Sequence, residues 1–472
     1  MRKNTKELFM IHITQILSRF IADLEYEDIP EAVIATTKMY ILDYYAACFA
    51  GIKINGKFNQ IMEDIFFEMG GKEESAVLCK DKKLPVGNAA FLNAVYAHGA
   101  DMDDGNRKAM GHVAAHVMST VFALAETLDV SGKDIITAIN AGYEVYNRAA
   151  AAVQPGLVRR GFHSTGTAGA LACGAAAAKL LGLDEKGIYN AISLAAIQSS
   201  GLMLITESGQ SCKPINPANA ARSGILAAQL AQKGIESSVY PLESSKGWFH
   251  AMSDSVDETE ITNGLGETFT ICESYLKPYP SCRHTHCGIE AAVKIRQQFL
   301  ENYGGIDLQK IKQIVVHIYP NAIRVAGNIQ MPRTDEESKF SIHYALATAL
   351  RRGHFDLEDL NVADTESEIH EIIERIILIP DESMENAKEG IRGAKVCLEC
   401  MDGTVYEEII KVPKGDAANP FTKQELQDKL AACADGVITA EQQNCLISAV
   451  ESFDKIEKYC SINTLFDVAG RK

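Results

Sequence analysis

The densest group of potentially catalytic side chains lies in the segment 98–112. It contains two imidazoles and three carboxylates within fifteen residues, and the segment separates two apolar helical stretches, 89–97 and 113–128. These side chains are His98, Asp101, Asp103, Asp104 and His112. Charges at the edge of a packed interior have pKa values shifted by burial and by their neighbours, as acid-base chemistry requires. The structural alternative is a cap and a turn between two helices.

Three further loops, each before a predicted helix, carry basic side chains. His163 lies in Gly161-Phe-His-Ser-Thr, Lys213 precedes the Ala-rich run that ends at Arg222, and a third loop spans 275–286. The third loop contributes Lys277, Arg283 and His286. Helix N-termini attract anions through free N–H groups and the helix dipole. Singly, each residue is expected to be a surface or capping residue, but together with Asp104 they form a candidate binding set for a di- or tricarboxylate.

The composition restricts the partners of the protein. The 472-residue chain carries 62 acidic and 46 basic residues, which gives a net charge of −16. This charge argues against nucleic acid or an anionic membrane as the main partner and favours a small-molecule substrate. The residues 8–24 have helical amphipathicity, unlike a signal peptide, and no segment is apolar enough to span a membrane. We therefore expect a cytoplasmic protein.

Two cysteine motifs resemble metal sites and are interpreted otherwise. Cys397 and Cys400 form a CxxC motif inside a predicted strand, where residues three apart face opposite ways. The run Cys282-Arg-His-Thr-His-Cys287 lacks the spaced ligand pairs of zinc modules. Neither motif predicts a metal site, and the twelve cysteines are expected to be mostly buried thiols.

Hydrophobic periodicity divides the chain into three parts. Residues 1–257 contain Ala-rich helical segments and predict a closely packed bundle. Residues 258–414 alternate β-rich runs with helices and predict a smaller α+β domain; strands are expected at 268–276, 311–319, 376–379 and in a hairpin over 394–412. Residues 415–472 return to helix and are expected to pack on the bundle. The predicted fold is thus mainly α, with an inserted α/β domain.

An ordered set of motifs resembles a known family. The motifs are His98-Gly-Ala-Asp-Met-Asp-Asp to Gly-His112, Gly-Phe-His163-Ser-Thr, Ala-Ala-Lys-Leu-Leu-Gly-Leu183, Lys213 to Ala-Ala-Arg-Ser-Gly224, Lys277-Pro-Tyr-Pro-Ser-Cys to His286, and Lys339-Phe-Ser-Ile-His-Tyr344. In this order they resemble the MmgE/PrpD family, which includes 2-methylcitrate dehydratase, cis-aconitate decarboxylase and iminodisuccinate epimerase.

The resemblance implies a helical domain completed by C-terminal helices, an inserted smaller domain, a homodimer and an active site in the cleft between the domains. It also implies that neither a metal nor an organic cofactor is needed. The residues that it places in the site are Asp101, His112, His163, Lys213, Lys277 and Tyr344. Three departures from the family pattern concern the substrate: Gly105 replaces a threonine, Val113 replaces a proline, and the segment 328–334 lacks an Arg-Pro pair.

The chemistry common to the family is proton transfer near carboxylates. We expect His163 with Lys213 or Lys277 to hold substrate carboxylates, while His112, oriented by Asp101, and Tyr344 exchange protons with the substrate. The favoured function is a lyase that dehydrates or decarboxylates a di- or tricarboxylate. The alternatives are an isomerase that epimerises an aminodicarboxylate such as iminodisuccinate and, third, a non-catalytic carboxylate-binding homologue. The sequence does not identify the substrate or its stereochemistry.

Overall fold

A computed structural model describes residues 12–206, 210–386 and 391–466. The chain forms two compact units. The helical unit comprises Met1–Gly99, Asp103–Ser274 and Lys423–Lys472, and the smaller unit comprises Ala100–Met102 and Tyr275–Thr422. The prediction of a mainly helical protein with a smaller α+β part is confirmed.

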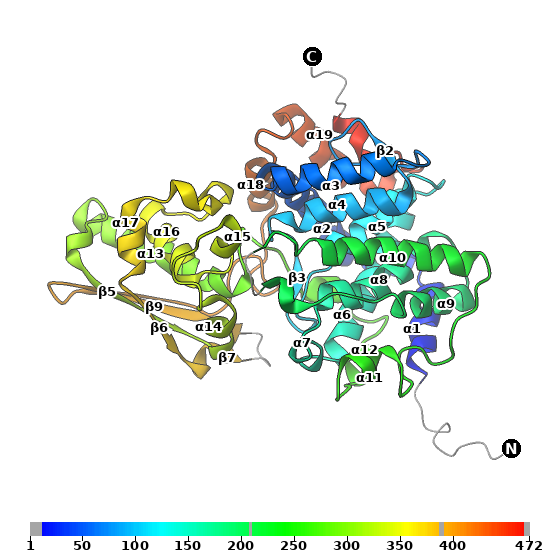
Figure 1. The fold of residues 1–472 in the computed structure, drawn as a ribbon, viewed down its shortest axis with the longest axis horizontal. Helices are drawn as coiled ribbons and strands as arrows, with labels where there is room; N and C mark the ends of the chain where they lie inside the picture. Colours follow the sequence, from blue (N-terminus) through cyan, green and yellow to red (C-terminus); the bar gives the residue numbers. More distant parts are fainter. Residues whose placement is uncertain (1–11, 207–209, 387–390, 467–472) are drawn as a thin grey trace. The chain divides into compact units, whose positions relative to one another are not determined.

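The helical unit contains long helices joined by short connections (Figure 1). Its longer helices are α1 (Ile13–Asp23), α2 (Glu31–Ile54), α3 (Gly56–Met69), α4 (Val86–Gly99), α5 (Ala114–Ala125), α6 (Gly132–Ala152), α8 (Ser164–Leu180), α9 (Glu185–Ala196), α10 (Ile215–Gln232), α18 (Lys423–Ala434) and α19 (Ala440–Glu451). Shorter elements are α7 (Gly156–Arg159), α11 (Trp248–Met252), α12 (Thr259–Thr262) and the strand pair β1 (Ser75–Ala76) and β2 (Lys83–Leu84). The helix predicted over 8–24 begins at Ile13, and residues 1–11 lie outside the described ranges.

Helix α8 lies at the centre of this unit, and its small residues explain why. Nearly all its side chains are buried, and it packs against α6, α9 and α10. A Cβ atom added to Gly224 of α10 would lie 2.2 Å from Cys173 Cβ of α8, so only glycine permits this approach. The alanine and glycine content therefore lets three helices contact one central helix closely.

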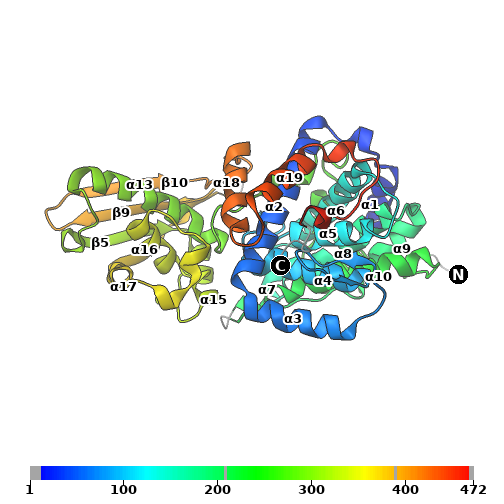
Figure 2. The same cartoon turned by 90° about the horizontal axis from the view of Figure 1, so that it is seen from above.

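The C-terminal helices α18 and α19 pack against α2, and Figure 2 shows them side by side. Lys429 of α18 forms a buried ion pair with Asp43 of α2. Helix α19 begins with a capping box, in which Thr439 and Gln442 bind each other's backbone N–H groups. The tail thus belongs to the helical unit, although some 150 residues separate it in sequence from the preceding part.

The helical unit extends beyond residue 257 to Ser274, because α6 binds the backbone of this segment. The Arg148 guanidinium donates hydrogen bonds to the carbonyl oxygens of Ile261, Asn263 and Thr268. The predicted strand over 268–276 is wrong: Thr270–Glu273 is a 3-10 helix, followed by the two-residue strand β4 (Ser274–Tyr275). In this segment, the backbone N–H and the hydroxyl of Thr270 donate hydrogen bonds to the Glu144 carboxylate.

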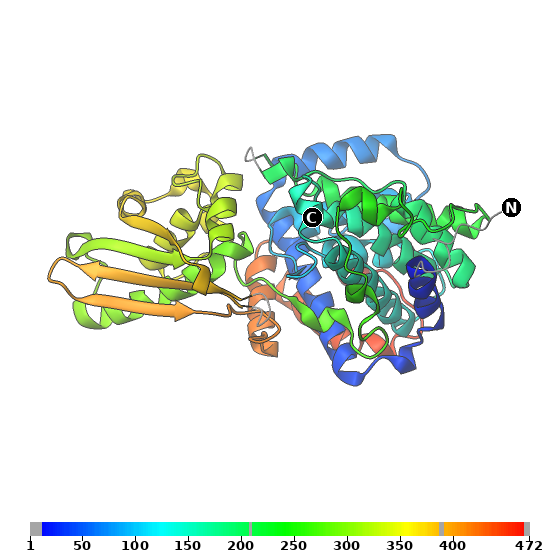
Figure 3. The same ribbon diagram turned by 90° about the horizontal axis from the view of Figure 1, so that it is seen from below.

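The smaller unit is built on a mixed four-stranded sheet, ordered β10-β9-β5-β6. The strands are β5 (Ile311–Ile318), β6 (Ile376–Pro380), β9 (Ala394–Cys400) and β10 (Val405–Ile410), and only the β5–β6 pair is parallel. The predicted hairpin is confirmed, with Gly403 at a positive φ of 88° in its turn. Helices cover one face, as Figure 3 shows, and α13 (His286–Tyr303) contacts β9 and β10.

The remaining helices and strands of the smaller unit are α14 (Pro320–Ala326), α15 (Asp335–Ser338), α16 (Ile342–Arg352), α17 (Ser367–Ile373), β7 (Glu385–Asn386) and β8 (Ile391–Arg392). Burial alternates along β9, so Cys400 lies on the covered face and Cys397 on the other. The CxxC motif therefore points in two directions, as predicted. No helix in the described ranges combines the length and apolar character that crossing a bilayer requires.

Candidate active site

Most of the segment 103–113, which leads into α5, is buried in the helical unit, and contacts near both of its ends fix its path. Gly111 lets this segment pass close to α6 and α8. An added Cβ atom would lie 2.2 Å from the Tyr146 hydroxyl of α6 and 2.5 Å from Ser164 Oγ of α8. Asp104 caps α5: its Oδ1 accepts hydrogen bonds from the backbone N–H groups of Val113 (3.1 Å) and Ala114 (2.8 Å).

Both oxygens of the Asp104 carboxylate accept hydrogen bonds from groups in the helical unit. Besides capping α5, it accepts a hydrogen bond from the Tyr143 hydroxyl through Oδ2 at 2.7 Å. Burial raises the pKa of Asp104 to about 6, although its backbone hydrogen bonds oppose this shift. Because both oxygens have partners and the residue is buried, this arrangement argues for a structural role rather than the predicted substrate contact.

The contacts of His112 Nδ1 define the tautomer of this residue. Its Nδ1 lies 2.6 Å from the Asp104 carbonyl oxygen and 3.4 Å from Asp103 Oδ1. Since a carbonyl oxygen can only accept, Nδ1 carries a hydrogen, and the neutral ring has its lone pair on Nε2. The backbone N–H of His112 donates to Thr165 Oγ1 at 3.1 Å, which fixes the residue against the start of α8. The ring is thus held in one tautomer, with Nε2 able to accept a proton.

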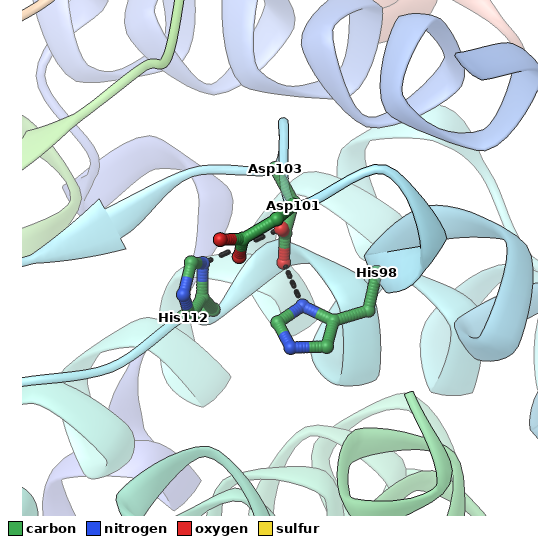
Figure 4. Close-up of side chains that lie close together, drawn as sticks. All are labelled: His98, Asp101, Asp103 and His112. Carbon is green, nitrogen blue, oxygen red and sulfur yellow. Dashed lines mark hydrogen bonds and ion pairs between the residues drawn. The ribbon is translucent and has the colours of Figure 1, made fainter. Parts of the chain in front are cut away.

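Asp103 connects His112 to a second imidazole, His98, near the end of α4 (Figure 4). Asp103 Oδ2 lies 2.8 Å from His98 Nδ1, and both side chains are completely buried. Burial alone would raise the pKa of Asp103, but the two imidazoles hold it well below its usual range. Burial lowers the pKa of His98 to about 4, with Asp103 opposing the shift, so His98 is neutral near pH 7. The carboxylate is therefore the ionised member of this group.

His163 and Lys213 lie near the same imidazoles. The ring centroid of His98 is 4.7 Å from that of His112 and 6.3 Å from that of His163. His163 occupies the N-cap position of α8, and its Nδ1 lies 3.0 Å from Asn216 Nδ2 of α10. The Lys213 charge contributes to the lowered pKa of His98, so the ammonium acts on this cluster. We call His98, Asp103, His112 and His163 the imidazole cluster.

The other predicted residues lie in the smaller unit. Lys277 is buried, and its Nζ lies 3.1 Å from Asp101 Oδ1 and 2.8 Å from the Asp101 carbonyl oxygen. Asp101 adopts a positive φ of 54°, which is uncommon for a residue other than glycine. The Tyr344 hydroxyl donates to the Asp359 carbonyl oxygen at 2.7 Å, and burial raises the pKa of Tyr344.

Arg283 and His286 stabilise the turn before α13. Arg283 Nη1 donates to the Lys414 carbonyl oxygen (2.9 Å) and to His286 Nδ1 (3.0 Å). His286 Nε2 in turn lies 3.2 Å from the Ser281 carbonyl oxygen. Because both ring nitrogens of the buried His286 have partners in the fold, the structure argues against the predicted substrate contacts of this pair.

Comparison with known proteins identifies the family. The model of the MmgE/PrpD N-terminal domain matches residues 15–260, and that of the MmgE/PrpD C-terminal domain matches residues 279–455. The chain belongs to the MmgE/PrpD family. It is similar to the cis-aconitate decarboxylase of Aspergillus terreus (strain NIH 2624 / FGSC A1156), with 27% identity over 94% of each chain. It is also similar to the human cis-aconitate decarboxylase, with 26% identity over 96% of this chain and 94% of the relative.

In this MmgE/PrpD protein, His98, Asp103 and His112 are close enough to be considered as metal ligands, with candidate atoms within 4.8 Å of one another. Nδ1 of each imidazole faces an oxygen acceptor at 2.6 or 2.8 Å and so carries a hydrogen, which leaves Nε2 of each ring as the nitrogen that could bind a metal. Within the described ranges, the cysteines and histidines of the 282–287 motif form no such group.

Three residues in or beside the imidazole cluster of this MmgE/PrpD protein have no individual role predicted from the sequence. His98 and Asp103 belong to the candidate segment 98–112, but the resemblance implies roles only for Asp101 and His112. Asn216 follows Lys213 by three residues, and the sequence gives no sign that it contacts an imidazole 53 positions earlier. Such contacts depend on how α8 and α10 pack.

Proposed function

We propose that this protein is a lyase that acts on a small di- or tricarboxylate by proton transfer at a carbon beside carboxylate groups. The observation that carries the proposal is the state of His112. Its Nδ1–H is directed at the Asp104 carbonyl oxygen, and the ionised Asp103 lies beside it, so Nε2 serves as the proton-exchanging atom. The nearby carboxylate would stabilise the imidazolium after His112 accepts a proton.

His163 and Lys213 are the proposed anion-binding groups. His163 lies at the N-terminus of α8, where free N–H groups and the helix dipole favour a carboxylate, and Lys213 contributes a positive charge near the same cluster. A local cationic group of this kind is needed because the whole chain carries a net charge of −16. The family resemblance is what supports Lys277, Tyr344 and Asp101 as further residues of the proposed active site.

Decarboxylation is the first candidate reaction, since several relatives are named cis-aconitate decarboxylase. When the bond between carbon and a carboxylate breaks, carbon dioxide leaves and the electron pair stays on carbon. A protonated His112 would deliver its Nε2 proton to that carbon framework and regain one from solvent. In a dehydration, the same nitrogen would instead remove a proton from carbon, the C–H electron pair would form the carbon–carbon double bond, and the hydroxyl group would leave as water with a proton taken from solvent.

The test is turnover of a panel of di- and tricarboxylates in deuterated water, followed by NMR of the products and by carbon dioxide release. We expect one panel member to lose carbon dioxide and to gain solvent deuterium on carbon. Loss of water with formation of an alkene would identify a dehydratase. Deuterium in an unchanged skeleton would identify an epimerase, and binding without any of these changes would contradict the lyase proposal.

A further inference from the structure

We propose that Asn216 is a positioning residue that fixes the tautomer of His163, so that Nδ1 is an acceptor and the hydrogen lies on Nε2. The tautomer itself follows from contacts inside the helical unit. Its consequence for catalysis rests on the proposed function, in which His163 binds a substrate carboxylate.

Two contacts of its nitrogen fix the orientation of the Asn216 amide. Nδ2 of Asn216 lies 3.3 Å from the Leu202 carbonyl oxygen, to which it donates, and 3.0 Å from His163 Nδ1. A carbonyl oxygen can only accept a hydrogen bond, so the amide atom between Leu202 and His163 must be the nitrogen. Its second hydrogen then points to His163 Nδ1, which has to accept. In the neutral ring, the remaining hydrogen is therefore on Nε2.

Close backbone contacts restrict the movement of the Asn216 and His163 side chains. The His163 backbone N–H donates to the Gly201 carbonyl oxygen at 3.0 Å, which joins the start of α8 to the segment before Leu202. A Cβ atom at Gly201 would lie 3.3 Å from Asn216 Cγ, and one at Gly166 would lie 3.2 Å from Asn216 Cβ. Both glycines therefore let the backbone approach the Asn216 side chain closely. Rotation of the amide would also give up its hydrogen bond to Leu202.

His112 and His163 differ in which ring nitrogen carries the hydrogen. His112 carries its hydrogen on Nδ1, which faces the Asp104 carbonyl oxygen, and offers a lone pair on Nε2. His163 has the opposite tautomer, with its hydrogen on Nε2. Two imidazoles of one cluster thus have complementary properties: one accepts a proton, and the other donates a hydrogen bond without carrying a charge. A donor suits the carboxylate that we assign to His163.

The experiment is a side-chain 1H–15N correlation spectrum of the full-length, 15N-histidine-labelled protein without substrate. His163 is assigned by the signals that disappear in His163→Gln. We expect His163 to show a protonated Nε2 and an unprotonated Nδ1. In Asn216→Asp, the carboxylate can only accept, so Nδ1 of His163 should become protonated. A wild-type His163 with the hydrogen on Nδ1, or a pattern that Asn216→Asp leaves unchanged, would overturn the inference.

Asn219→Asp is the matched control, since it adds the same charge to the same helix. Asn219 donates to Ser200 Oγ and accepts from Arg222, so we expect the His163 signals to stay as in the wild type. With a substrate in hand, Asn216→Asp should lower kcat/KM roughly 10- to 100-fold, mainly through KM, because one hydrogen bond to a charged group is lost. Failure to turn over any carboxylate would contradict the proposed function, whereas the wild-type spectrum alone decides the tautomer.

Discussion

The imidazole cluster of the helical unit and the basic turn of the smaller unit start from similar sequence signals. Both place histidines and cationic residues directly before a helix. In the cluster, His98 Nε2 is buried with no hydrogen-bond partner in the described part of the chain, and His112 has its lone pair on Nε2. In the basic turn, Arg283 and both ring nitrogens of His286 bind atoms of their own unit.

This difference shows that residue type and position before a helix are not enough to identify a functional group. The decisive property is whether a polar atom is already satisfied by the fold. A buried polar group with its partners in place stabilises a structure, whereas a rigidly held group with an unpartnered atom in the described part of the chain, such as His98 Nε2, is prepared for a ligand. Substitutions in both regions distinguish these two roles.

Replacement of His112 by alanine should lower kcat by roughly 10²- to 10⁴-fold, the usual contribution of a general acid or base. The thermal unfolding midpoint should stay close to that of the wild type. His250→Ala, which changes an exposed histidine of α11, serves as the control and should keep full activity. A His112→Ala enzyme with nearly normal kcat would remove this residue from the mechanism.

Asp104→Asn should change the pH dependence of stability, measured as the free energy of unfolding between pH 4 and pH 7. The folded-state pKa of Asp104 is raised to about 6, so its proton stabilises the fold below pH 4 and this contribution is lost as the pH rises through 6. The difference from the ordinary value of 3.8 corresponds to about 3 kcal/mol. The Asn variant should therefore gain most of this amount relative to the wild type on going from pH 4 to pH 7.

Asp103→Asn provides the opposite sign for comparison. The pKa of Asp103 is held well below its usual range in the folded protein, so its ionised form stabilises the fold at neutral pH and this contribution is lost in acid. The variant should be destabilised most at pH 7. Equal pH profiles for the two variants would contradict the separate roles of these adjacent carboxylates.

Arg283→Met should lower the free energy of unfolding by about 1.5–3 kcal/mol, because the Lys414 carbonyl oxygen and His286 Nδ1 lose a charged donor. Turnover per folded molecule should be unchanged. Arg324→Met, at an exposed position of α14, should leave both properties unaffected. A raised KM with normal stability would instead place Arg283 in substrate binding.

Much of the fold could be predicted from local sequence. Helical periodicity and alanine content predicted the Ala-rich helices, and the β-rich residues of 394–412 predicted the β9–β10 hairpin. Asp104 is a residue type that commonly caps helices, so its contact with the start of α5 was among the open alternatives.

The remaining features depend on contacts between residues far apart in sequence. The segment 268–276 has strand-forming residues, but Thr270–Glu273 forms a 3-10 helix whose first backbone N–H donates to Glu144, 126 positions away. The same limit applies to the site: the sequence indicated His163 but not Asn216, and a tautomer follows from the partner of each ring nitrogen. Tertiary contacts, rather than local preferences, decide both cases.

The most direct test of the account is a titration of the 15N-histidine-labelled protein with cis-aconitate or with another substrate identified in the panel. We predict that the side-chain signals of His98, His112 and His163 shift together with a single dissociation constant, while those of the exposed His250 and His354 remain in place. Turnover of the same compound with unperturbed signals from the imidazole cluster would contradict the claim that this cluster binds and transforms the carboxylate.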